Sequence, residues 1–226
     1  MSIGMTPQAP SPANPGPVTS QAPGAWVPAD QLVDPTVSRL KFDREVAACR
    51  AIEADYHRRG WWILSAEFPN VTVAFVAPQL RPAAVIFGAR INFENYDLWA
   101  PSVRLVDPFT SVPLRHRDVP ATLYLTRRTV GVVNIPGLGQ MEQVTDVPLL
   151  QTHGPDELPF FCIPGVREYH EHPAHSGDDW LLHRGRGEGT LHFLLEKLAR
   201  YGLEPIQRYQ LGLHIAGVAL NPEVPT

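Results

Sequence analysis

Residues 93–105 read FENYDLWAPSVRL, and this stretch decides how the first half of the chain is organised. Strand-like runs occupy 83–93 and 103–106, on either side of an aromatic and proline-containing segment at 94–101. Proline fixes its own backbone and restricts the residue before it, so this segment is expected to lie extended rather than helical. The stretch therefore predicts a corner that joins two neighbouring strands.

Two further strand-like runs, at 61–66 and 71–77, precede that corner. The turn signals Pro69-Asn70 and Pro78-Gln79 separate the runs. Short strands joined by short turns favour a four-stranded antiparallel meander.

A helix is predicted before the meander. It begins at Asp34-Pro35, because an acidic residue followed by proline suits a helix N-terminus. It ends at Gly60, since glycine can adopt the left-handed conformation of a helix C-terminus. Side chains at helical spacing form one apolar face, namely Phe42, Val46, Cys49, Ile52 and Tyr56. Cys49 is therefore expected to be a buried, unreactive thiol.

The middle of the chain is less regular. Residues 107–159 are interpreted as an insertion between the scaffold and the reactive region. Within it, 122–125 and 130–135 are predicted to form a hairpin across Arg127-Arg128. The rest of the insertion is punctuated by prolines and has no clear period.

The chain has 226 residues, of which 44% are apolar, and this is enough to bury one sizeable core. Residues 1–30 contain almost no large apolar side chain and are expected to be a mobile tail. Residues 31–226 are expected to form a single α+β domain. A second amphipathic helix is predicted from Leu191 to Tyr201, and Gly202 is expected to close it as a C-terminal glycine in the left-handed conformation.

The formal net charge is −4 and no long run of like charges occurs, so neither nucleic acid nor an anionic membrane is an expected partner. Two cysteines cannot make a disulfide framework, which favours a reducing compartment. No apolar run reaches the length of a membrane span, and residues 1–30 lack the features of a signal peptide. The protein is therefore expected to be cytoplasmic.

Residues 160–180 read FFCIPGVREYHEHPAHSGDDW and concentrate the reactive side chains. They contain one of the two cysteines, three of the nine histidines and four carboxylates, which can serve as nucleophiles, bases and metal ligands. Pro164 and Gly165 break regular structure after Cys162, so its thiol is expected at a surface turn. Three interpretations stay open for this cysteine: acyl transfer, metal ligation, and burial in a short core strand at 160–163.

The order of the elements resembles that of ubiquitin-conjugating enzymes: a helix, a four-stranded meander, an aromatic-proline corner, a cysteine, a tryptophan and a closing helix. The resemblance rests on residues 93–105, Phe161-Cys162-Ile163 and Trp180. It implies an α+β, ubiquitin-conjugating-enzyme-like fold with an insertion before the cysteine. It also implies a carrier that takes a ubiquitin-like protein from its activating enzyme as a thioester on Cys162 and passes it to a protein amine.

The family's His-Pro-Asn motif has its nearest counterpart in residues 152–156, THGPD, which lack the asparagine. A narrower resemblance is to divergent bacterial relatives encoded beside ubiquitin-like proteins, in operons associated with defence against phage. One such set is described by a Cys-Glu-His-His metal-binding signature. That signature would be filled by Cys162, by Glu168 or Glu171, and by two of His170, His172 and His175.

In the transfer model no cofactor is required and Cys162 is the nucleophile. His170 or His172 lowers the pKa of the thiol or deprotonates the attacking amine. Glu168 or Asp179 orients that histidine, although Asp179 equally suits the N-cap of a helix that begins at the next residue.

In the alternative model the region is a zinc-binding structural or interaction module without acyl transfer. His170 and His172 would share a face of an extended segment, and a proline stiffens the turn between His172 and His175. With the sulfur of Cys162 they would supply the nitrogen and sulfur ligands that zinc prefers, and Glu171 is a further candidate ligand. A third interpretation treats the histidines as part of a solvated polar loop.

Overall fold

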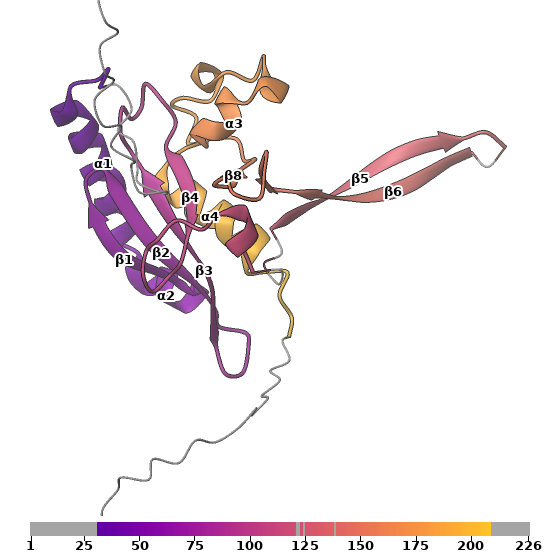
Figure 1. Cartoon of the computed structure of the whole chain (residues 1–226), viewed down its shortest axis with the longest axis horizontal. Coiled ribbons are helices and arrows are strands. Elements are labelled where there is room, and N and C mark those ends of the chain that lie inside the picture. Colours follow the sequence, from indigo (N-terminus) through magenta and orange to yellow (C-terminus); the bar gives the residue numbers. More distant parts are fainter. Residues whose placement is uncertain (1–30, 121–122, 124, 138, 209–226) are drawn as a thin grey trace, which may run out of the picture.

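Figure 1 shows the computed structural model, which describes residues 31–208 except 121, 122, 124 and 138. The predicted tail at 1–30 and the apolar segment at 209–220 lie outside the described residues. Every helix within the described ranges is too short or too polar to cross a membrane.

Four antiparallel strands form the central sheet, in the order β1-β2-β3-β4. They are β1 (Trp61–Glu67), β2 (Asn70–Ala77), β3 (Ala84–Asn92) and β4 (Ser102–Val106). Cross-strand neighbours such as Phe75 and Phe87, or Ile91 and Val103, are buried and pair apolar side chains across the sheet. The predicted meander is confirmed.

The N-terminal helical segment consists of two helices, α1 (Pro35–Arg50) and α2 (Glu53–Arg59). The Asp34 carboxylate accepts a hydrogen bond from the Thr36 backbone N–H and so caps α1. The prediction of one continuous helix is wrong at Ile52, where the backbone leaves the helical conformation (φ −121°) and the side chain is 45% exposed. The other predicted face residues are buried or half-buried, and Cys49 is buried as expected.

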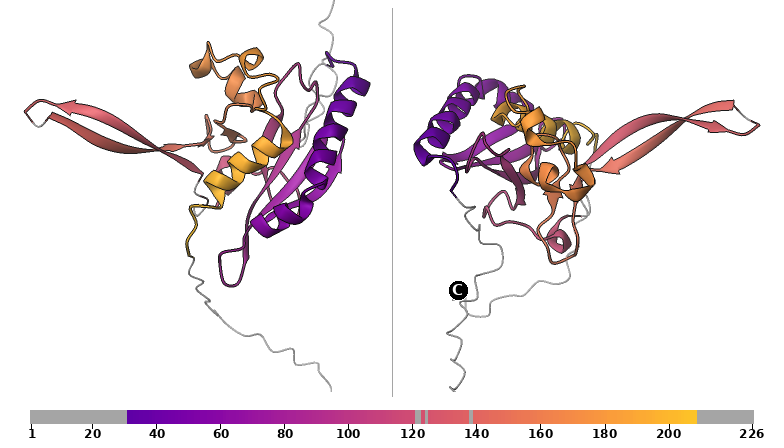
Figure 2. Two further views of the ribbon diagram at one scale, coloured as in Figure 1. Left: turned by 180° about the vertical axis from the view of Figure 1, so that it is seen from behind. Right: turned by 90° about the horizontal axis from the view of Figure 1, so that it is seen from above.

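Helices α1 and α4 (Leu191–Gly202) lie side by side and cover one face of the sheet (Figure 2). The apolar side chains of α4 that were predicted from their spacing are buried there, including Leu191, Leu194, Leu195 and Leu198. The Glu45 carboxylate on α1 accepts a hydrogen bond from the Leu191 backbone N–H at 3.3 Å. The core therefore lies between this helix pair and the sheet.

Gly202 is the last residue of α4 and not the left-handed residue after it, so its predicted role is wrong. A Cβ atom at this position would lie 2.5 Å from Cε1 of the buried Phe87 ring. Glycine is required here because α4 approaches β3 too closely for a side chain.

The corner at 94–101 is made of turns, so its predicted extended conformation is wrong, although the segment is not helical. Two buried side chains from the second half of the chain fasten it. The Arg167 guanidinium donates hydrogen bonds to the carbonyls of Glu94 (2.6 Å) and Ala100 (3.1 Å). The Trp180 indole N–H donates to a third carbonyl of the corner at 2.9 Å. These bonds hold the region after the sheet against its edge.

The insertion contains a long hairpin of β5 (Thr126–Ile135) and β6 (Gly139–Pro148), which projects away from the body of the molecule (Figure 1). The predicted hairpin is wrong in position, because Arg127 and Arg128 lie inside β5 and pair with β6. Nearly all residues of both strands are exposed, so no alternation of apolar and polar side chains marks them in the sequence.

Short elements fill the rest of the described insertion and lead on to α4. They are η1 (His116–Asp118), β7 (Leu150–Gln151), β8 (Phe160–Phe161), α3 (Arg167–Glu171), η2 (Pro173–His175) and η3 (Trp180–Leu182). Strands β7 and β8 pair antiparallel at the base of the hairpin. Turns join these elements, and the reactive side chains lie among them.

A substitution at Gly60 tests how closely the junction between α2 and the sheet is packed. It has the predicted left-handed conformation (φ +83°), and an added Cβ would lie 1.8 Å from the carbonyl oxygen of Val76. We expect Gly60→Ala to lower the free energy of unfolding by more than about 2 kcal/mol, because backbone strain and a clash with the backbone both oppose alanine. Urea unfolding measures this change.

Gly131→Ala is the matched control, because the atom nearest to its added Cβ is 3.9 Å away. This control is expected to change the free energy of unfolding by less than about 0.5 kcal/mol. Equal effects of the two substitutions would contradict the account of Gly60.

Candidate functional site

Cys162 directly follows β8, and its backbone N–H donates a hydrogen bond to the carbonyl of Leu149 at 2.7 Å. The residue is 8% exposed, and residues 160–163 are all buried. The predicted surface turn is therefore wrong for Cys162, and the alternative of a short buried strand describes its surroundings better. Burial raises the pKa of the Cys162 thiol, and the charge of Arg127 offsets part of that rise.

A pocket of about 150 Å³ borders Cys162. Its walls come from the base of the hairpin, from the segment after the cysteine and from α4, and they include Arg127, Pro164, Glu188 and Lys197. The thiol is thus shielded from bulk solvent but has free space beside it, with two cationic side chains on the rim.

His175 is the histidine that contacts the thiol. Its Nε2 lies 3.3 Å from the Sγ of Cys162, within hydrogen-bonding distance for sulfur. His175 ends η2, and the Nδ1 of His172 caps that turn by accepting the Ala174 backbone N–H. The sequence placed His175 only among the possible metal ligands, yet a thiol beside an imidazole is the arrangement of a nucleophile with its base.

A chain of contacts continues behind His175. The ring of Tyr169 stacks on the imidazole of His175 with 4.0 Å between centroids, and the Tyr169 hydroxyl donates to Oδ2 of Asp178 at 2.6 Å. Burial, followed by the hydrogen bond to Asp178, raises the pKa of Tyr169 to about 12, so the hydroxyl stays protonated and acts as a donor.

Asp178 is held in turn by His183, whose Nε2 lies 2.6 Å from Oδ1 of the carboxylate. The Nδ1 of His183 hydrogen-bonds the carboxylate of Glu188. Burial opposes a charge on His183, but the bonds to Asp178 and Glu188 outweigh it and raise the pKa of the imidazole. The bonds from Tyr169 and then His183 lower the pKa of the Asp178 carboxyl. The two pKa shifts both favour an ion pair of imidazolium and carboxylate.

His170 and His172, the predicted bases, do not contact Cys162. His170 lies on α3, not on an extended segment, so the predicted shared face is wrong. Its Nε2 accepts the Gly165 N–H at 3.0 Å and its Nδ1 faces the Asp178 carbonyl at 2.7 Å. Burial lowers the pKa of His170, consistent with a neutral ring whose two nitrogens are both engaged.

Glu168 and Asp179, the predicted orienting carboxylates, have other partners. Glu168 forms an ion pair with Arg104 at 3.0 Å and accepts a hydrogen bond from the Ser102 hydroxyl on β4. Asp179 caps η3 by accepting the Leu181 backbone N–H at 2.8 Å. Both carboxylates stabilise local structure and do not orient a histidine.

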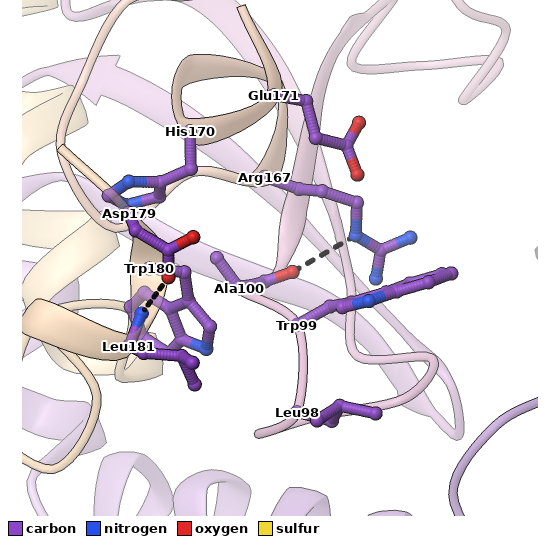
Figure 3. Close-up of a pocket in the computed structure, with 9 residues that line it drawn as sticks. All are labelled: Leu98, Trp99, Ala100, Arg167, His170, Glu171, Asp179, Trp180 and Leu181. Atoms are coloured by element: carbon purple, nitrogen blue, oxygen red, sulfur yellow. Dashed lines mark hydrogen bonds between the residues drawn. The ribbon is translucent and has the colours of Figure 1, made fainter. Parts of the chain in front are cut away.

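Asp179 and Glu171 also line a second pocket, of about 340 Å³, between α3, η3 and the corner (Figure 3). Trp99 and Trp180 form part of its wall, and the guanidinium of Arg167 lies 5.0 Å from the centre of the Trp99 ring. Burial raises the pKa of Glu171, and Arg167 offsets part of the rise. Glu171 therefore belongs to this pocket and not to the surroundings of the thiol.

The predicted zinc set is not assembled among the described residues: of its members only His175 contacts Cys162. A different group brings its ligand atoms within 4.8 Å of one another, namely His170, Asp178 and His183. His183 and Glu188 were not among the predicted site residues. Asp178, His183 and Glu188 follow one another at steps of five residues, which matches neither the helical nor the strand period and so gave no signal.

Comparison with known proteins shows which family this chain is similar to. A model of the Y4jH-like family matches residues 33–206. The chain is 40% identical, over 201 residues, to the uncharacterized protein y4jH of Sinorhizobium fredii (strain NBRC 101917 / NGR234). That alignment covers 87% of this chain and 98% of the relative. The sheet, the hairpin and the surroundings of Cys162 all lie within the matched residues.

His183 gives stability a specific pH dependence. Its pKa is raised above the ordinary value of 6.5, so its contribution is complete below about pH 6.5 and is lost as pH rises through the folded-state pKa. The pKa of Asp178 is lowered from 3.8, so its contribution to the free energy of unfolding persists until pH falls below about 4. We expect His183→Gln to lower the thermal unfolding midpoint most near pH 5.5, with a smaller loss above about pH 8.

His116→Gln is the control, because His116 is exposed and has no carboxylate partner among the described residues. A loss of stability in His183→Gln that stays constant across this pH range would argue against an imidazolium at position 183.

Proposed function

The chain belongs to the Y4jH-like family, and we propose that it is a ubiquitin-conjugating-enzyme-like carrier in a bacterial conjugation system. In this proposal it accepts a ubiquitin-like protein from its activating enzyme as a thioester on Cys162. It then passes that protein to an amine on an acceptor protein. We further propose that this reaction takes place in the reducing cytoplasm and that the operon encoding the protein serves in defence against phage.

The contact between Cys162 and His175 is the observation that carries the proposal. At 3.3 Å the imidazole can take the proton of the thiol as sulfur attacks the thioester carbonyl on the activating enzyme. The thiolate of the activating enzyme then leaves and receives the proton. In the second step an amine attacks the new thioester, gives up its proton to the imidazole, and releases the Cys162 thiolate.

The raised pKa of Cys162 makes this base necessary. A thiol that ionises less than usual at neutral pH depends on a neighbouring group to remove its proton as the new bond forms. His175 is placed for this role, which the sequence had assigned to His170 or His172.

The missing asparagine calls for another stabiliser of the oxyanion. Asp156, its counterpart in sequence, is an acceptor that pairs with Arg117 and so cannot donate. In the proposal, Arg127 and Lys197 supply positive charge beside the reacting carbonyl, because both line the pocket next to the thiol.

The order of the elements also supports the proposal. A helical segment precedes a four-stranded antiparallel meander, which includes the corner between β3 and β4. A buried cysteine, a buried tryptophan and a closing helix follow, as in the resembled family. Trp180 is hydrogen-bonded to the corner, so two of the stretches that carry the resemblance are joined in space.

Adduct formation tests the proposal. The purified protein is mixed with ATP, the activating enzyme and the ubiquitin-like protein of the same operon, and a species sensitive to reducing agent is measured on a gel. We expect Cys162→Ala to abolish this adduct and His175→Ala to slow its formation by roughly 100-fold, the lower range for general-base catalysis.

Cys49→Ala is the control and should form the adduct normally, because Cys49 is buried in the core. An adduct that persists in Cys162→Ala would remove Cys162 from the proposed role.

A zinc-stabilised interaction module is the second candidate function. The proximity of His170, Asp178 and His183 favours it, because two imidazoles and a carboxylate can bind zinc. Its difficulty is that His170 would have to give up one of its hydrogen bonds to bind a metal. Stoichiometric zinc in protein purified without added metal would support this candidate.

A further inference from the structure

His175 lies on a short turn, and a base in that position needs a neighbour that fixes the orientation of its ring. In familiar nucleophile-base pairs a third group hydrogen-bonds the second nitrogen of the imidazole. Within the described residues, the hydrogen bond to Cys162 is the one that the His175 side chain makes. The neighbour that restrains this ring is Tyr169, which stacks on it at 4.0 Å.

Tyr169 is itself anchored at its far end. Its hydroxyl donates to Oδ2 of Asp178 at 2.6 Å, and Oδ1 of the same carboxylate faces Nε2 of His183 at 2.6 Å. Asp178 is thus held by one partner on each oxygen. A ring fixed at its hydroxyl cannot turn away from the imidazole that stacks on it.

Glu188 closes the chain of contacts. Its carboxylate holds the Nδ1 of His183, and the same residue lines the pocket beside Cys162. The contacts therefore run from the thiol through five side chains, the last of which, Glu188, lines the pocket that borders the thiol. The other charged groups facing that pocket are Arg127 and Lys197.

We propose that Tyr169 and Asp178 are positioning residues for His175, and that His183 and Glu188 hold Asp178 in place for this purpose. The inference rests on the proposed role of Cys162 as a nucleophile. It explains why carboxylates gather in this region although none of the predicted ones contacts a catalytic histidine. Tyr169 acts through its hydroxyl and its stacked face, and exchanges no proton with the substrate.

The rate of alkylation of Cys162 by iodoacetamide tests this inference without any partner protein. The full chain is used with Cys49→Ala, so that one thiol remains, and rate constants are measured from about pH 5.5 to about pH 10. We expect Tyr169→Phe to slow alkylation near pH 7 by roughly 3- to 10-fold, in the direction of His175→Ala. At the highest pH the variants should converge, because the thiolate then forms without help from a base.

Asp178→Asn is the second variant and should change the profile in the same way, since an amide has one acceptor oxygen and cannot accept from both Tyr169 and His183 as the two carboxylate oxygens do. Tyr96→Phe is the control, because it removes a hydroxyl from a buried tyrosine that packs on Phe93 and not on His175. At each pH the alkylation rate constant of this control should lie within a factor of about two of that of the Cys49→Ala parent. Circular dichroism spectra ensure that only folded variants are compared.

Unchanged profiles in Tyr169→Phe and Asp178→Asn would overturn the inference. Stoichiometric zinc in the purified protein would also overturn the inference if its removal by a chelator altered the alkylation profile of the Cys49→Ala parent. A metal bound to Asp178 and His183 would replace the hydrogen bonds that join these residues to each other and to Tyr169. A slower profile with no ubiquitin-like adduct would uphold the positioning role and reject the proposed function. A normal adduct with unchanged alkylation profiles in both variants would uphold the proposed function and reject the positioning role.

Discussion

The hydrogen bonds of one buried arginine hold the two halves of this protein together. Arg167 is 7% exposed, and its guanidinium donates to the carbonyls at both ends of the corner that joins β3 to β4. Its backbone N–H donates to the carbonyl of Pro101 as well. Burial lowers the pKa of Arg167, but a guanidinium remains charged, and carbonyl oxygens compensate for the water it has lost. This clamp, together with the Trp180 indole and the contacts of Glu168 with β4, holds α3 and the turns after it against the sheet.

Polar contacts, more than an apolar core, organise the region beyond the clamp. Between Cys162 and α4 the longest regular element has five residues. Side chains satisfy the backbone groups that such short elements leave unpaired: Asp179 caps η3 and His170 accepts the Gly165 N–H. Ile163, Val166 and Trp180 are the buried apolar residues that this region contributes to the core. Stability and chemistry therefore depend on the same hydrogen bonds here.

The sequence predicted the elements that contribute most of the core. The helices α1, α2 and α4 each bury one face, which gives the helical spacing from which they were predicted. Strands of the meander such as β2 and β3 bury consecutive residues, and they were predicted as strand-like runs between turn signals. The hairpin β5–β6 has no buried face, so its strands lacked the signal and were misplaced. Ile52 continued the helical spacing but lies at a break that no spacing could indicate.

The site was predicted less well, for a related reason. Residue types singled out Cys162 and its histidines correctly as a group, but which imidazole meets the sulfur depends on the path of the chain. A short helix takes His170 away from the thiol and the turn after Pro173 brings His175 to it. Tyr169 was overlooked because its position depends on a stacking contact with His175 that the sequence does not show.

The long hairpin has a consequence for the cysteine. Leu149 comes directly after β6, and its carbonyl accepts the backbone N–H of Cys162, while Arg127 of β5 borders the thiol. Both sides of the hairpin therefore contribute, at its base, to the wall of the space beside the sulfur. The surroundings of the thiol thus depend on how the hairpin is anchored to the body of the molecule.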